Sequence, residues 1–113
     1  MVEKLKISNA VAAVLACFLE DVDADRYGMD LMRDANLPSG TLYPILARLA
    51  AAGWVSASWE DIDPEAEGRP ARRYYRLTPD GAVAAHAELA KMHNRLSKVL
   101  GHKPGTQPGW GSA

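Results

Sequence analysis

Four arginines lie close together in the stretch GRPARRYYRLT, and their side chains are suited to binding phosphate groups. They are Arg69, Arg72, Arg73 and Arg76. Guanidinium groups form charge-assisted hydrogen bonds with phosphate oxygens, and the two neighbouring tyrosines add hydroxyl donors. The positive charge is local, because residues 69–103 hold eight Lys/Arg and two Asp/Glu while the whole chain has a net charge of −1. This pattern is compatible with a surface that binds nucleic acid, although an ordinary solvated face is the commoner reason for such a charge asymmetry.

A second group of candidate residues lies in the stretch SGTLYPILARLAAAGW, residues 39–54. Its apolar residues have helical spacing and predict one buried face, formed by Leu42, Ile45, Leu46 and Leu49. The opposite face is small, with Gly40, Pro44, Ala47 and Ala51, and it is flanked by Thr41, Tyr43 and Arg48. A helix with so small an outer face can lie close to a groove floor, and its flanking groups can contact phosphates or base edges. An ordinary surface helix is the alternative interpretation.

Pro44 fits this helix if the helix begins between Ser39 and Thr41. The N–H groups of a first helical turn have no intrahelical partners, so a proline there costs little. We therefore predict that Ser39 or Thr41 caps the helix and that Gly53 ends it in the left-handed conformation.

Other kinds of chemistry have little support in the sequence. Its three histidines, His86, His93 and His102, belong to no metal-binding or catalytic motif, and Cys17 lies among apolar residues, as a buried and unreactive thiol would. We therefore expect no enzymatic activity, no metal and no cofactor. No stretch approaches the roughly 18 consecutive apolar residues of a membrane span, so we expect no membrane partner and a cytoplasmic location.

Five elements are expected to position the candidate residues. Apolar spacing predicts a helix over Val11 to Leu19 with Ser8 as its cap, and a shorter helix from Tyr27 to Ala35 that ends at the turn NLPS. The helix of residues 39–54 follows. The segments WVSASWE and ARRYYRLT then predict a two-stranded hairpin with a polar loop at its tip. Thr78 is placed to cap a last helix that runs to about Leu100.

This order predicts a mainly α-helical protein with a small β-hairpin (α+β), arranged as a winged helix-turn-helix. In such a unit the second helix of the pair lies in the major groove of DNA, and the hairpin forms the wing. Residues 1–78 are expected to form this domain, residues 79–101 a dimerisation helix, and residues 102–113 a disordered tail.

The last helix carries a heptad-like apolar seam, which predicts a homodimer. The seam consists of Ala82, Ala85, Leu89, Met92, Leu96 and Val99. We expect the interface to contain the seam residues from Ala85 onward, with Val14, Leu15 and Phe18 of the first helix packed beside them.

Three motifs occur here in the same order as in the PadR family of winged-helix transcriptional regulators, which the chain resembles. They are YGMDLM, SGTLYPILARLAAAGWV and GRPARRYYRLTPDG, within roughly residues 8–100. The resemblance implies a homodimeric repressor that binds double-stranded DNA, with one short C-terminal helix as in the smaller PadR subfamily. It makes Ser39, Gly40, Thr41, Tyr43 and Pro44 groove residues and Arg69 a wing contact.

The candidate DNA-binding set also includes Tyr27 of the first motif, Arg48, Arg72 and Arg73. The last helix has no aromatic residue, so the ligand platform of PadR-like multidrug sensors is not expected, and the identity of any small-molecule inducer stays open. Five acidic residues between Glu60 and Glu67 favour an alternative function, that of a winged-helix adaptor or antirepressor that does not bind DNA.

Overall fold

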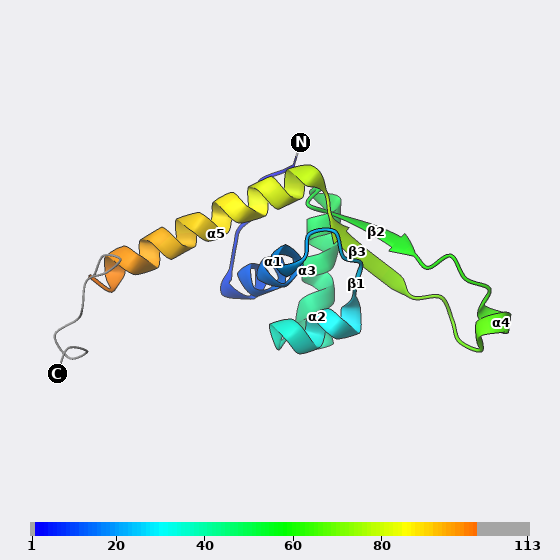
Figure 1. Ribbon diagram of the computed structural model, residues 1–113. Coiled ribbons are helices and arrows are strands. Elements are labelled where there is room, and N and C mark those ends of the chain that lie inside the picture. Colours follow the sequence, from blue (N-terminus) through cyan, green and yellow to red (C-terminus); the bar gives the residue numbers. More distant parts are fainter. Residues whose placement is uncertain (1, 102–113) are drawn as a thin grey trace.

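The computed structural model describes residues 2–101, and the segment 102–113, predicted to be a disordered tail, lies outside the described residues. Helices and strands follow one another as Figure 1 shows. In chain order they are α1 (Asn9–Glu20), β1 (Arg26–Tyr27), α2 (Gly28–Ala35), α3 (Ser39–Ala51), β2 (Val55–Trp59), α4 (Pro64–Glu67), β3 (Arg73–Leu77) and α5 (Pro79–Val99). The predicted fold class is confirmed, since the described chain is mainly helical with one small antiparallel sheet.

The sheet has three strands in the order β1-β3-β2, so the prediction of a two-stranded hairpin was incomplete. β2 and β3 form the predicted hairpin, with Val55 opposite Leu77 and Trp59 opposite Arg73. β1 pairs with the other edge of β3, but its two residues are too few to show alternation in the sequence. The wing, defined here as β2, β3 and the loop between them, also contains the unpredicted short helix α4.

The turn between α2 and α3 begins at Asn36, the C-cap of α2, which adopts the left-handed conformation with φ 55°. α3 then begins at Ser39 with Pro38 as its N-cap, so the prediction of a Ser39 or Thr41 cap was wrong. Pro44 consequently lies beyond the first turn, where it removes the hydrogen bond that a residue there would donate to the Gly40 carbonyl. Because Gly40 is exposed, water can hydrate that carbonyl.

The core lies between α1, α2, α3, the sheet and the first turns of α5. All four apolar residues predicted for the buried face of α3 are buried. Val14, Leu15 and Phe18 of α1 are also at most 1% exposed within the single chain. They leave no surface for a partner, so we assign them to the core of one chain and not to the dimer interface.

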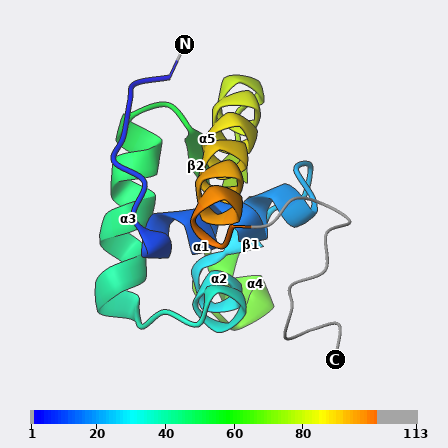
Figure 2. The same cartoon turned by 90° about the vertical axis from the view of Figure 1, so that its left-hand side faces the viewer.

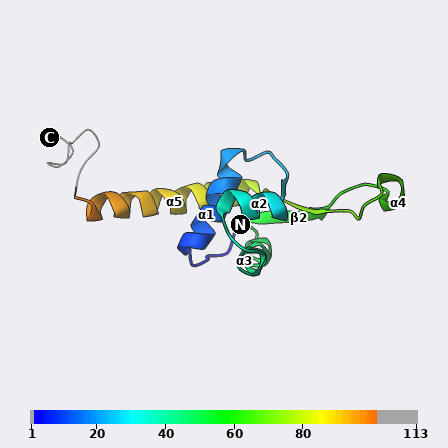
Figure 3. The same cartoon turned by 90° about the horizontal axis from the view of Figure 1, so that it is seen from below.

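α5 joins the wing without a linker. As predicted, Thr78 caps it by accepting a hydrogen bond from the Gly81 N–H at 2.9 Å. The Thr78 hydroxyl donates to the Gly53 carbonyl at 2.7 Å, and its N–H donates to the Trp54 carbonyl at 3.0 Å. A Cβ at Gly81 would lie 2.7 Å from the Trp54 carbonyl carbon, so the helix start needs a glycine to pack this closely. Beyond these turns α5 and the wing extend in opposite directions from the helical domain (Figure 3).

Candidate nucleic-acid interface

The outward face of α3 is small and exposed, as the sequence predicts. Ser39, Gly40, Thr41 and Pro44 are all exposed, and a Cβ placed on Gly40 would meet no other atom within 4 Å. No side chain caps the start of this helix, which leaves its first N–H groups able to meet an anion. α3 also lies along one side of the molecule, at the left of Figure 2, where a groove can receive it.

A cleft of about 400 Å³ separates α2 and α3 from the wing. It brings together four of the predicted DNA-binding residues, which are Tyr27, Tyr43, Arg72 and Arg73. Tyr27 packs edge to face against Tyr74, with ring centroids 6.2 Å apart. Residues from three separate elements therefore line one cleft beside the exposed face of α3.

Arg72 and Arg73 keep their charges available. Both are exposed, and neither forms an ion pair with another residue in the part of the chain that the structure describes. The guanidinium of Arg73 lies over the Trp59 ring, 5.3 Å from its centroid, and this cation–π contact orients the side chain without neutralising it. The cleft thus has two uncompensated cations on its wing side.

Arg69, predicted as a wing contact, is paired inside the wing. Its guanidinium donates to both carboxylate oxygens of Glu60, at 2.7 and 3.1 Å, and the Arg72 N–H donates to the same carboxylate. The hydrogen bond from Arg69 lowers the pKa of Glu60 to about 2. Arg76 is paired as well, with Asp25 at 2.7 Å. Two of the four clustered arginines are therefore balanced by acids of the same chain.

Arg48 lies apart from the cleft. It borders a small separate hollow together with Leu5 and Lys6 of the N-terminal segment. The structure therefore places the predicted DNA-binding residues in four groups, which are the face of α3, the cleft, the ion pair of Arg69 inside the wing and this other flank of α3.

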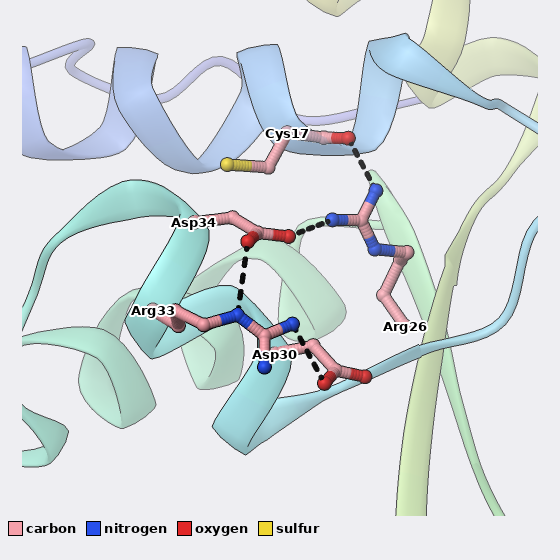
Figure 4. Close-up of polar contacts among 5 residues, drawn as sticks. All are labelled: Cys17, Arg26, Asp30, Arg33 and Asp34. Atoms are coloured by element: carbon pink, nitrogen blue, oxygen red, sulfur yellow. Dashed lines mark hydrogen bonds and ion pairs between the residues drawn. The ribbon is translucent and has the colours of Figure 1, made fainter.

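Sequence reasoning missed a polar network that holds α2 in place (Figure 4). The Arg26 guanidinium donates to the Cys17 carbonyl at 2.7 Å and to the Asp34 carboxylate at 2.9 Å. Asp34 also accepts from Arg33, which in turn pairs with Asp30 at 3.2 Å. The side chain of Arg26 is only 12% exposed, so it links the end of α1 to α2 from a nearly buried position. No local pattern reveals this role, because its partners lie eight and nine residues away.

The Cys17 thiol is not a reactive group in this structure. It is buried, and this burial raises its pKa, which disfavours the reactive thiolate. His86 and His93 are exposed, and the described residues contain no group of three or more metal-ligand side chains. Within residues 2–101 no helix is both long enough and apolar enough to cross a membrane.

The residues predicted for the dimer seam fall into two groups along α5. Ala85 is fully buried against its own domain, so it too belongs to the core of one chain. Leu89 and Met92 are half-buried. Leu96 and Val99 are 59% and 82% exposed, on the part of the helix that projects from the domain (Figure 1). This outer part of the predicted seam is therefore the part that the single chain leaves exposed.

Comparison with known proteins identifies the family. Residues 19–87 match the family model described as the transcriptional regulator PadR-like family. A comparison with curated proteins finds no match.

Several solved structures have the same fold. A PadR-like transcription factor from Bacteroides fragilis is 26% identical, with a TM-score of 0.62, over 81% of this chain and 86% of that one. A PadR family transcriptional regulator from Eggerthella lenta is also 26% identical, with a TM-score of 0.59, over 80% of this chain and 76% of that one. The protein smu.1704 from Streptococcus mutans is 25% identical, with a TM-score of 0.67, over 88% and 92%. The PadR-family proteins among these are transcriptional regulators.

Proposed function

The chain belongs to the PadR-like family of transcriptional regulators, and from this premise we propose that it is a homodimeric repressor that binds a double-stranded DNA operator. The observation that carries this proposal is the exposed small face of α3 next to a cleft with two uncompensated arginines. A small helical face fits a major groove, and free guanidinium groups beside it fit the phosphate backbone.

Each group of surface residues has a place in such a complex. Gly40 and its neighbours Ser39, Thr41 and Pro44 face the groove floor, where a missing Cβ lets the helix backbone lie close to the bases. The cleft is lined by Tyr27, Tyr43, Arg72 and Arg73. Their polar groups would contact the phosphate backbone on the wing side. Arg48 serves the backbone on the opposite flank of α3. Arg69 contributes less, because Glu60 already accepts its hydrogen bonds.

The dimer is proposed to form through α5, so that residues 1–78 act as the DNA-binding domain and residues 79–101 as the dimerisation helix. Leu96 and Val99 support this division, because both are apolar and exposed on a helix that extends past its own domain. Half-buried Leu89 and Met92 continue the same seam toward the domain. A dimer of this kind presents two copies of α3 to half-sites about 34–36 Å apart.

Binding of a small-molecule inducer is proposed to take place at the dimer seam. Trp54 does not offer a binding surface, since it is 2% exposed and its indole N–H donates to the Glu3 carbonyl at 2.6 Å. Met92 of the seam remains accessible, whereas Trp59, with 61% of its surface exposed, lies opposite Arg73 at the end of β2 away from α5 and therefore outside the seam.

The alternative function, a protein–protein adaptor that does not bind DNA, is favoured by the wing tip. The exposed residues Asp61 and Asp63 precede α4, Glu65 and Glu67 lie within it, and all four would repel phosphates. An electrophoretic mobility shift assay with the DNA upstream of the protein's own gene separates the two functions. A specific shift that survives excess unrelated DNA supports the repressor. Absence of any shift at low salt, with the protein folded by circular dichroism, supports the adaptor.

A further inference from the structure

Gly28, the first residue of α2, lies directly against the side chain of Tyr43 from α3. A Cβ built on Gly28 would lie 2.7 Å from Cζ and 2.9 Å from Cε1 of Tyr43, and closer still to its hydroxyl oxygen. Separations this short do not occur between a real Cβ and its neighbours. A side chain at position 28 and the observed position of the Tyr43 ring therefore exclude each other.

The backbone does not require a glycine at position 28. Within residues 2–101, the glycines with positive φ are Gly53, Gly68 and Gly101, and Gly28 is not among them. An alanine would adopt the same helical conformation and would give a slightly more stable helix. A glycine is needed at position 28 because the Tyr43 ring occupies the space that a Cβ would fill.

Gly40 shows that a glycine in the first turn of a helix is not crowded in every case. Both glycines stand in the first turn of a helix, but a Cβ on Gly40 would meet nothing within 4 Å. The protein leaves open space outside Gly40, whereas it fills the space outside Gly28 with the Tyr43 ring.

The contact holds the Tyr43 hydroxyl at the DNA-facing surface. Tyr43 is 42% exposed and lines the cleft together with Arg72 and Arg73. Its hydroxyl makes no hydrogen bond to another described residue, so packing on Gly28, and not a polar contact, keeps the ring in the cleft. The O–H group remains available for an acceptor supplied by a ligand.

We propose that Gly28 is a positioning residue for DNA binding, which leaves room for Tyr43 so that the phenol is held in the cleft beside Arg72 and Arg73. The inference rests on the proposed function, because it assigns the phenol to an oxygen acceptor on the operator. A methyl group at position 28 would displace the Tyr43 ring toward solvent, which is possible because Tyr43 is a long side chain at the surface.

The test is a double-mutant cycle of Gly28→Ala, Tyr43→Ala and the combined variant. Affinity is measured by fluorescence anisotropy with the upstream duplex shifted by the wild-type protein. We expect Gly28→Ala to weaken binding roughly tenfold to a hundredfold for each half-site of the operator, the effect of removing one hydrogen bond to a charged group from each chain. In the Tyr43→Ala background the same change should have no effect, because the ring that needed the space is gone. Wild-type affinity of Gly28→Ala, or an equal decrease in both backgrounds, would overturn the inference.

A measurement without DNA separates this inference from the proposed function. In protein labelled with ring-¹³C tyrosine, the Tyr43 resonance is assigned by its disappearance in Tyr43→Ala and is then compared between wild type and Gly28→Ala. A shifted resonance supports displacement of the ring, and an unchanged one overturns it. If the wild-type protein binds no DNA while the resonance still shifts, the contact stands and the proposed function fails.

Discussion

Shortening the exposed apolar residues of α5 should dissociate the proposed dimer. Leu96 and Val99 are the seam residues with the most uncovered surface, at 59% and 82% exposure. Leu89 is a poorer target, because it packs against the core of its own chain and its replacement would also weaken the fold. We therefore expect Leu96→Ala and Val99→Ala to shift the monomer–dimer equilibrium while the unfolding transition of each chain stays intact.

The expected magnitude follows from the exposed fractions. Leu96→Ala removes about three methylene equivalents, each worth about 0.8 kcal/mol when fully buried. Since 59% of Leu96 is exposed before association, the decrease in stabilisation is at most about 1.4 kcal/mol per chain, or about 2.8 kcal/mol per dimer. This corresponds to an increase of about 100-fold in the dissociation constant of the dimer. By the same reasoning Val99→Ala should cost about 2.6 kcal/mol per dimer.

Sedimentation equilibrium over a range of protein concentrations measures these constants, and α5 itself supplies a matched control. Val83 is 73% exposed but lies off the seam, so Val83→Ala changes the same side chain on the same helix without touching the interface. We expect it to leave the dimer unchanged. Equal dissociation constants for Val83→Ala and Val99→Ala would refute the seam, as would a wild-type protein that is monomeric at every concentration.

Three further predictions follow from the charged groups. Replacing Arg72 and Arg73 with alanine should weaken binding to all DNA sequences. The slope of log affinity against log salt concentration should become shallower by about 0.9 for each phosphate that is no longer neutralised. Arg76→Ala should have less effect, because Arg76 is already paired with Asp25. Arg26→Ala should lower the free energy of unfolding, measured in urea, by roughly 1.5–3 kcal/mol, which is the contribution of one charged hydrogen bond. Arg33→Ala should change it by less than about 1 kcal/mol, because the side chain of Arg33 is 72% exposed. The pKa of Glu60 is lowered to about 2 in the folded protein, so its pair with Arg69 stabilises the fold above about pH 4.3 and this stabilisation disappears as the pH falls toward 2. The midpoint temperature of thermal unfolding should therefore depend less on pH across that range in Glu60→Gln than in the wild-type protein.

Local chemistry in the sequence was enough to predict most helices. Ser8 and Thr78 accept the cap hydrogen bonds expected of them, because a cap depends only on residues three positions away. The buried face of α3 was also predictable, since four apolar residues at helical spacing can be buried together in only one orientation. The α3 cap failed because a proline at the N-cap position fixes the extended backbone without any side-chain acceptor.

Contacts between distant residues account for what the sequence did not reveal. The acidic residues near the wing arginines are visible in the sequence, but which arginines they balance depends on the fold. Glu60 lies nine residues from Arg69, and Asp25 lies 51 residues from Arg76. Only the folded sheet shows that Arg72 and Arg73 are the two left uncompensated. The crowding of Gly28 by Tyr43 is of the same kind, because both residues have ordinary helical backbones and meet only when α2 packs on α3.

The junction between the wing and α5 determines how a change at the dimer seam would reach the DNA-facing surface. Thr78 is tied to the carbonyls of Gly53 and Trp54, and Gly81 packs against the same Trp54 carbonyl. Because Ala85 is fully buried one turn later, the first two turns of α5 move together with the domain that carries α3. In the proposed dimer, a change in the angle between two α5 helices must therefore alter the separation of the two α3 helices. Bending at the junction between the wing and α5 would instead break the Thr78 hydrogen bonds, so regulation of DNA binding is expected to act between the chains.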